Sequence, residues 1–191
     1  AVTLLFPPSI IKIVEGEIMQ LCNTKKNHTK EDYFDIIYRK TAVLFEIACE
    51  SSAIGCEATH QEQQASKLFG HHLGLGFQIV DDILDYTSDS KTLGKDIGDD
   101  LKQGKITLPL IYTLEEITKD KKKQLLDDIS NNNANLEEIQ ATIRSTNAIK
   151  RCYQEAEQHH QKAINQLSHL PQNSHNNQLR DLIEFNRHRL K

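Results

Sequence analysis

Residues 59–86 read THQEQQASKLFGHHLGLGFQIVDDILDY. Thr59 followed three residues later by Glu62 forms a capping box, which is typical of a helix start. The apolar residues that follow recur every three or four positions, the spacing of one buried helix face. Gly70 and Gly74 carry no side chain within this helix and let a neighbouring helix approach closely. The stretch therefore predicts a long helix at the core of a helical protein.

The rest of the chain shows the same helical character. Only eight Gly and four Pro are present, and most lie between segments with helical spacing. Further helices are predicted from Ser9 to about Leu21, from Thr29 to about Gly55 and from Thr107 onward. Three shorter helices then follow, separated by 131–135 and 171–177, and the polar stretch 87–105 is predicted to be a loop. No repeat or shift in composition divides the chain, so we expect one all-α domain over 1–191.

Composition and charge exclude several classes of protein. The 191 residues are 38% hydrophobic and 26% charged with a net charge of −4, which fits neither a disordered nor a collagen-like chain. The nearly balanced charge argues against nucleic-acid binding by a general basic field. The longest apolar run, 1–6, stops at Pro7 and is too short to span a membrane. It also lacks the basic leader of a signal peptide.

The cysteines and histidines are interpreted as structural residues. No CxxC spacing is present, so we expect reduced thiols in the core of a cytoplasmic protein, at Cys22, Cys49, Cys56 and Cys152. Adjacent histidines point in different directions on a helix, which disfavours metal binding by His71-His72 or His159-His160. We expect these histidines to be solvated or to cap helices.

Three acidic residues end the long helix. Asp81, Asp82 and Asp85 have no Lys or Arg one turn before them, and like charges at this spacing destabilise a helix. A hard divalent cation would offset the repulsion, and ligands that are all oxygen favour Mg²⁺, which also binds substrate phosphates. The alternative is a solvated acidic helix end.

Basic and polar residues on either side of the acidic trio suggest a binding site for a polyanion. Lys95 and Lys105 each follow a glycine and could bind phosphate oxygens as point charges. Upstream, Lys40 and Thr41 interrupt an apolar helix, and Gln78 lies one turn before Asp82. All of these side chains could face one cavity. Each taken alone is equally compatible with an ordinary surface residue.

Five motifs in order carry a family resemblance: Gly16-Glu17-x-x-Gln20, Tyr38-Arg39-Lys40-Thr41-Ala42, Phe77-Gln78-x-x-Asp81-Asp82-x-x-Asp85, Gly94-Lys95 and Gly104-Lys105. The chain resembles the trans-polyprenyl diphosphate synthases. The resemblance runs from about Ile10 to the C-terminus, is closest between Tyr38 and Leu110, and is nearest to octaprenyl-type long-chain synthases.

The resemblance implies a fold and a set of residue roles. Family members are homodimers, each subunit an isoprenoid synthase-type helical bundle around a central cavity that holds Mg²⁺ and an allylic diphosphate. By resemblance, Asp81, Asp82 and Asp85 form the second aspartate-rich motif. The residues implied to contact the allylic diphosphate or assist its departure are Lys40, Thr41, Gln78, Lys95 and Lys105. Phe77 matches an aromatic residue of the homoallylic pocket.

The implied activity is condensation of an allylic diphosphate with isopentenyl diphosphate to a polyprenyl, octaprenyl-length product. The alternatives are a farnesyl or geranylgeranyl diphosphate synthase, a noncatalytic partner subunit, and a class I terpene cyclase. In one respect the sequence departs from the family, because a first aspartate-rich motif should lie upstream of Glu17 and does not. We therefore expect the chain to be the C-terminal portion of a longer synthase and to be inactive alone.

Overall fold

The computed structural model describes residues 2–27, 29–87 and 98–189. Within these ranges every regular element is a helix, which confirms the predicted all-α class. The elements are η1 (Val2–Leu4), α1 (Phe6–Asn23), α2 (Lys30–Ile37), η2 (Tyr38–Ala42), α3 (Val43–Gly55), α4 (His60–Thr87), α5 (Asp99–Lys102), α6 (Leu108–Glu116), α7 (Lys119–Ser130), α8 (Leu136–Arg144), α9 (Ala148–Leu167) and α10 (Ser174–His188). None of these helices combines the length and hydropathy that a bilayer-spanning segment requires.

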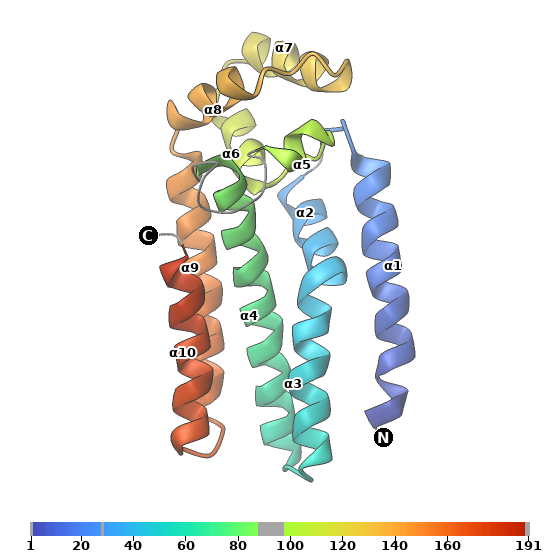
Figure 1. The fold of residues 1–191 in the computed structure, drawn as a ribbon, viewed down its shortest axis with the longest axis vertical. Helices are drawn as coiled ribbons and strands as arrows, with labels where there is room; N and C mark the ends of the chain where they lie inside the picture. Colours follow the sequence, from blue (N-terminus) through green and yellow to red (C-terminus); the bar gives the residue numbers. More distant parts are fainter. Residues whose placement is uncertain (1, 28, 88–97, 190–191) are drawn as a thin grey trace.

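The long helices lie side by side, with α4 in the middle and α7 and α8 across one end (Figure 1). α4 packs chiefly against α3 and α9. Its apolar face is buried completely, since Ile79, Val80 and Ile83 are each 0% exposed. Burial of each such side chain contributes roughly 1.5–3 kcal/mol. The part of α4 that carries the acidic residues is therefore held firmly in the bundle.

Two glycines set the distance between α3 and α4. A Cβ atom at Gly70 would lie 2.3 Å from the backbone oxygen of Phe45, and one at Gly74 would lie 2.6 Å from Cα of Ala42. Neither backbone atom can move aside without a shift of the whole helix. The predicted close approach of a neighbouring helix at these glycines is confirmed.

Capping boxes start two helices where the sequence predicts them. The Glu62 carboxylate accepts hydrogen bonds from the backbone N–H of Thr59 at 2.8 Å and from its hydroxyl at 2.7 Å. Thr29 and Asp32 form the same reciprocal arrangement at the start of α2. These contacts satisfy backbone donors that the first turn of a helix leaves unpaired.

Other boundaries differ from the predictions. Four helices follow α6, not three, because the chain breaks at 145–147 between α8 and α9. No Gly or Pro marks this break. Instead the hydroxyls of Ser145 and Thr146 donate to the backbone carbonyls of Thr142 and Ile143 and compete with the helix. The predicted loop 87–105 contains the single-turn helix α5, and its residues 88–97 lie outside the described ranges.

The interpretation of the cysteines is right in part. Cys152 is buried and Cys49 is partly buried, and burial raises the pKa of the Cys49 thiol to about 11. Cys22 and Cys56 are exposed, so the prediction that they are core thiols is wrong. Cys56 follows the last residue of α3, where the chain turns away from the bundle.

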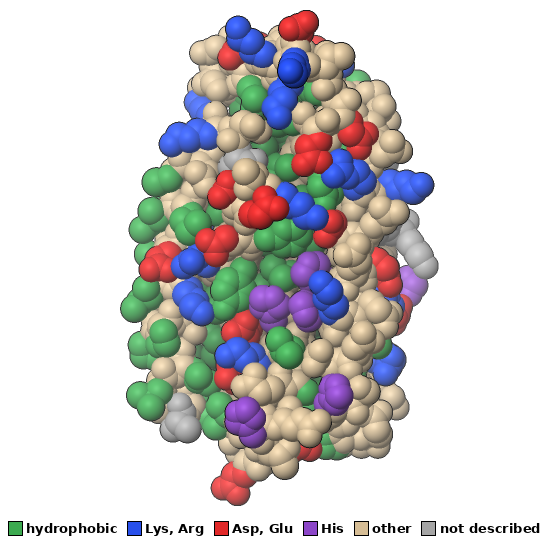
Figure 2. Space-filling view, turned by 180° about the vertical axis from the view of Figure 1, so that it is seen from behind, with side chains coloured by type: hydrophobic (Ala, Val, Ile, Leu, Met, Phe, Trp, Pro, Cys, Tyr) green, Lys and Arg blue, Asp and Glu red, His purple; other side chains and the backbone are tan. Residues whose placement is uncertain are grey.

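The histidines were predicted to be solvated or capping, which is wrong for two of them. His159 is 8% exposed and His160 is 1% exposed. The rings of His72 and His159 contact each other, with their Nδ1 atoms 3.2 Å apart, and His71 lies against His72. Figure 2 shows histidine side chains gathered near the middle of the face of the molecule that it views. The helix–helix contact between α4 and α9 brings these residues together.

The histidine contact predicts an acid-sensitive contribution to stability. Burial lowers the pKa of His72 and of His159 to about 4, and nearby His71 and Lys162 add to the shift. The unfolded chain, with pKa near 6.5, takes up protons first as the pH falls, so these residues favour unfolding below about pH 6.5. After discounting for solvent at the partly exposed His72, the loss between pH 7 and pH 5 is about 1–2 kcal/mol.

Urea unfolding at pH 7 and pH 5 measures this loss as a difference between the wild type and the double variant His72→Gln, His159→Gln. The comparison is necessary because Asp82 and Asp85 have raised pKa values, which act in the opposite direction over the same range. The wild type is expected to lose more stability than the variant on acidification. An identical loss in both proteins would contradict the assignment.

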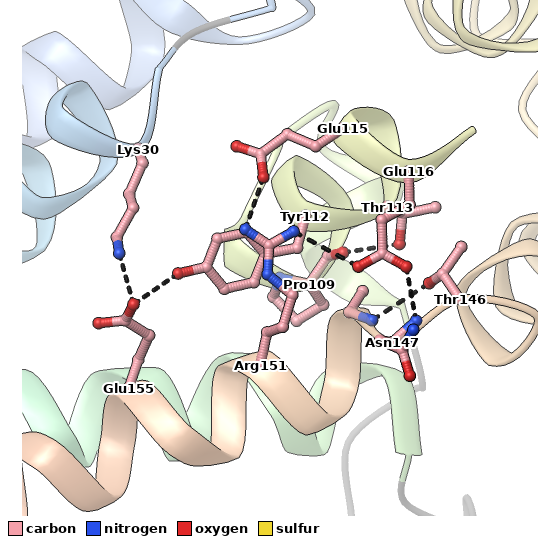
Figure 3. A network of polar contacts seen from close by, with 11 residues as sticks. Lys30, Pro109, Tyr112, Thr113, Glu115, Glu116, Thr146, Asn147, Arg151 and Glu155 are labelled. Carbon is pink, nitrogen blue, oxygen red and sulfur yellow. Dashed lines mark hydrogen bonds and ion pairs between the residues drawn. The ribbon is translucent and has the colours of Figure 1, made fainter. Parts of the chain in front are cut away.

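A polar network joins α2, α6 and α9 (Figure 3). Lys30 pairs with the Glu155 carboxylate, which also accepts a hydrogen bond from the Tyr112 hydroxyl at 2.8 Å. The Arg151 guanidinium lies 3.7 Å from the centre of the Tyr112 ring and pairs with Glu115 at 2.6 Å. Burial raises the pKa of Tyr112 to about 12, so its hydroxyl stays a donor. The network connects α2 to α6 and α9.

Candidate functional site

A cavity of about 200 Å³ lies where α1, α2, η2, α4 and the segment around α5 meet. Six of the residues predicted from the sequence line it: Lys40, Thr41, Gln78, Asp81, Asp82 and Lys105. They come from three separate parts of the chain. Apolar side chains complete part of the wall, including Ile36, Ile37 and Ile106. The cavity is thus lined by both charged and apolar side chains.

The Lys40-Thr41 pair lies in a π-helical turn, η2 (Tyr38–Ala42), between α2 and α3. Such turns insert an extra residue into a helix and occur often at functional sites. The Thr41 hydroxyl donates to the Gln78 side-chain oxygen at 2.7 Å. Lys40 Nζ donates to the Gln20 side-chain oxygen at 2.6 Å and pairs with Glu17 at 2.8 Å. The first and second sequence motifs therefore meet at Lys40.

Asp82 is the most buried acid of the site, at 2% exposure. Its carboxylate accepts hydrogen bonds from the Tyr33 hydroxyl at 2.6 Å and from the Gln78 amide at 2.8 Å. Burial raises the pKa of Asp82 to about 8, and the charges of Asp100 and Asp81 add to this increase. The two hydrogen bonds oppose the shift but do not overcome it. The buried Asp82 carboxyl therefore favours its protonated form near neutral pH.

Asp85 faces a different environment. The backbone amides of Asp99 and Asp100 hydrogen-bond to it, while burial and the Asp100 charge raise its pKa to about 6. Its Oδ2 atom is buried and has no hydrogen-bond partner among the described residues. Asp85 does not line the cavity.

Asp81 makes a third kind of contact, because its Oδ1 accepts a hydrogen bond from Arg189 at 2.9 Å. The three carboxylates thus have different partners and do not converge as the sequence suggested. Within 2–27, 29–87 and 98–189, no three His, Cys, Asp or Glu side chains are close enough to hold a metal ion.

The other predicted residues do not all line the cavity. Lys105 lines the cavity and pairs with Asp100 at 3.0 Å. Phe77 does not line it, and its ring packs against Phe45 with the centroids 5.5 Å apart. Lys95 lies outside the described residues.

Tyr33 and Asp100 are among the cavity residues that the sequence analysis missed. Tyr33 looks like one more apolar position of an amphipathic helix, and no local pattern shows that its hydroxyl reaches Asp82. The sequence did offer a signal for Asp100, which lies two residues after Gly98 and five before Lys105. Glycine often marks a turn, and Gly98 does adopt one, with a φ of 74°.

Comparisons with known proteins point to one family. The family model described as "Polyprenyl synthetase" matches residues 1–146. The chain is 36% identical over 182 residues to an all-trans-nonaprenyl-diphosphate synthase (geranyl-diphosphate specific) of Rhodobacter capsulatus, covering 94% of this chain and 56% of that protein. It is 38% identical over 162 residues to the octaprenyl diphosphate synthase of Escherichia coli, covering 83% and 50%.

The fold has solved counterparts as well. The crystal structure of a decaprenyl diphosphate synthase from Rhodobacter capsulatus superposes with a TM-score of 0.92 at 29% identity, covering all of this chain and 60% of that one. This chain therefore spans between half and three fifths of the length of these proteins.

Proposed function

The chain belongs to the polyprenyl synthetase family and has its isoprenoid synthase-type helical fold, and on this basis we propose that it is part of a trans-polyprenyl diphosphate synthase. The enzyme would condense an allylic diphosphate with isopentenyl diphosphate. The observation that carries the proposal is the meeting of Lys40, Thr41, Gln78, Asp81, Asp82 and Lys105 in one cavity.

The acidic side chains fit Mg²⁺ as the cofactor. They offer only oxygen ligands, which suit this ion, and the buried Oδ2 of Asp85 has no donor among the described residues. Burial, together with the charge of Asp100, raises the pKa values of Asp82 and Asp85, and a bound cation would favour their charged forms. Asp81 and Asp82 line the cavity and Asp85 does not, so the three would hold the ion only once their side chains turn toward it, and its charge would then stabilise the departing diphosphate.

The chain's own residues would position the substrate and exclude water. Lys40 and Lys105 provide ammonium groups for the diphosphate oxygens, and Gln78 links Thr41 to Asp82 through two hydrogen bonds. Isoleucines on the cavity wall would keep water from an electron-poor allylic carbon. The bond that breaks joins that carbon to the diphosphate oxygen, so no Ser, Cys or His nucleophile is required.

The length of the product is a further part of the proposal. An octaprenyl-length product is supported by the overall similarity to the Escherichia coli protein, while the Rhodobacter capsulatus relative is named for a nonaprenyl product. Farnesyl or geranylgeranyl diphosphate is the alternative product.

We also propose that the protein is cytoplasmic and forms a homodimer. The apolar surface of α1 supports the homodimer. Its exposed side chains Ile10, Ile11, Val14, Ile18 and Leu21 are 53–64% accessible and recur at helical spacing. Figure 2 shows hydrophobic side chains along the edge where α1 lies. Such an area fits an interface with a second subunit or with the rest of a longer chain.

Incorporation of radiolabelled isopentenyl diphosphate in the presence of Mg²⁺ and farnesyl diphosphate tests the activity. A full-length synthase containing this chain is expected to give polyprenyl diphosphates, and the 191-residue chain alone is expected to give none. Cyclic hydrocarbons formed without consumption of isopentenyl diphosphate would instead identify a terpene cyclase. Absence of both products in the full-length protein would indicate a noncatalytic subunit.

A further inference from the structure

Arg189, at the C-terminal end of α10, reaches the acidic motif on α4. Its Nη2 atom donates to Oδ1 of Asp81 at 2.9 Å, across 108 positions of sequence. None of the five motifs includes this arginine. The last helix of the fold is thus connected directly to the first carboxylate of the acidic trio.

The aromatic ring of Phe77 holds the guanidinium in place. The centre of the guanidinium lies 4.9 Å from the ring centroid, within the range of a cation–π interaction. The Arg189 side chain is 21% exposed, and its Nη1 atom is buried without a hydrogen-bond partner among the described residues. A buried unpaired donor costs free energy, so contacts with Asp81 and Phe77 must compensate for this placement.

Arg187, two residues earlier on α10, is about as exposed as Arg189 but forms its ion pairs away from the cavity. It pairs with Glu157 and Glu184, whose side chains are 56% and 44% exposed. Neither glutamate lines the cavity of the acidic motif. Asp81 does line that cavity. Arg187 and Arg189 therefore differ in the role of the acid that each one holds.

The contact with Arg189 also distinguishes Asp81 from the other acids of its motif. Among the described residues no Lys or Arg forms an ion pair with Asp82 or Asp85, whereas Asp81 has Arg189 and Asp100 has Lys105. Asp81 and Asp100 are thus each held by a cation. Fixing a carboxylate through one oxygen restricts its rotation while the second oxygen stays available as a ligand.

We propose that Arg189 is a positioning residue that orients Asp81 for binding of the divalent metal ion. This inference rests on the proposed function, because it assumes that the acidic motif holds a metal. Groups that hydrogen-bond to metal ligands typically change metal affinity about 10- to 100-fold when they are removed. Loss of Arg189 should therefore weaken metal binding to a similar extent.

The test is titration of Mn²⁺, a paramagnetic probe for Mg²⁺, into the 191-residue chain with inorganic pyrophosphate present. Electron paramagnetic resonance reports free Mn²⁺ and so gives the dissociation constant. We expect Arg189→Gln to raise this constant about 10- to 100-fold. Arg187→Gln is the matched control on the same helix and should leave the constant within about twofold. Arg189→Lys, which keeps the charge but not the planar group, should fall between the two.

Three results would overturn the inference. Unchanged affinity in Arg189→Gln would show that the contact has no role in metal binding. Tighter binding in that variant would show that the arginine competes with the metal. Equal losses in Arg187→Gln and Arg189→Gln would indicate a general effect on α10, which circular dichroism and urea unfolding of both variants would register independently.

The same titration separates this inference from the proposed function. If the wild type binds Mn²⁺ and Asp81→Asn does not, the metal site stands whatever Arg189→Gln shows. If the wild type itself binds no Mn²⁺ with pyrophosphate, both the metal site and the role of Arg189 are wrong. A double-variant cycle between Asp81→Asn and Arg189→Gln should be strongly non-additive, since each change removes the same contact.

Discussion

Asp81→Asn is expected to lower the rate of diphosphate release by a full-length synthase about 100- to 1,000-fold. The substitution keeps the shape of the side chain but removes the negative charge that would hold a metal ion at the cavity. It also leaves Arg189 beside a neutral amide in place of its carboxylate partner. Steady-state release of diphosphate, measured with saturating allylic and isopentenyl diphosphates, reports the effect in kcat.

Asp127→Asn provides the matched control for this prediction. Asp127 is an exposed acid on α7 and is not among the residues that line the cavity. Its substitution removes the same unit of charge and should leave kcat within about twofold. Normal turnover by Asp81→Asn would refute the assignment of the acidic motif as a metal site.

Gly70→Ala is expected to destabilise the fold by about 3 kcal/mol. The added Cβ would lie 2.3 Å from the Phe45 carbonyl oxygen and 2.7 Å from its carbon. These are backbone atoms of α3, so the contact can be relieved only by separating α3 from α4. Urea unfolding followed by circular dichroism measures the change in the free energy of unfolding.

Gly55→Ala makes the same chemical change where there is space for it. Gly55 is the last residue of α3, and no atom lies within 4 Å of the position that its Cβ would take. The variant should change stability by no more than about 0.5–1 kcal/mol, in the stabilising direction, because alanine restricts the unfolded chain. Equal losses in the two variants would mean that close packing at Gly70 does not limit stability.

The sequence predicted the helical architecture because its signals are local. The capping boxes at Thr59 and Thr29 and the glycines of α4 each act within a few residues, and each appears in the structure as expected. The break at 145–147 was missed because hydroxyl groups of Ser145 and Thr146 end the helix, and such residues also occur within helices. Propensity alone does not distinguish these two cases.

The site was predictable where residue types follow the chemistry of phosphate and metal binding. The motifs identified Lys40, Gln78 and Lys105, and all three line the cavity. Tyr33 was missed because its role depends on how α2 packs against α4, which no spacing along the chain shows. The different partners of the three aspartates were missed for the same reason. Arg189 reaches Asp81 through tertiary packing alone.

Lys40 is engaged by α1 through Gln20 and Glu17. An anion that takes over this ammonium group must first displace both side chains, so its observed affinity is reduced by the cost of separating them. Once displaced, Gln20 and Glu17 no longer anchor α1 to η2. If α1 also forms the proposed subunit interface, occupancy at the cavity and the strength of that association would be thermodynamically linked.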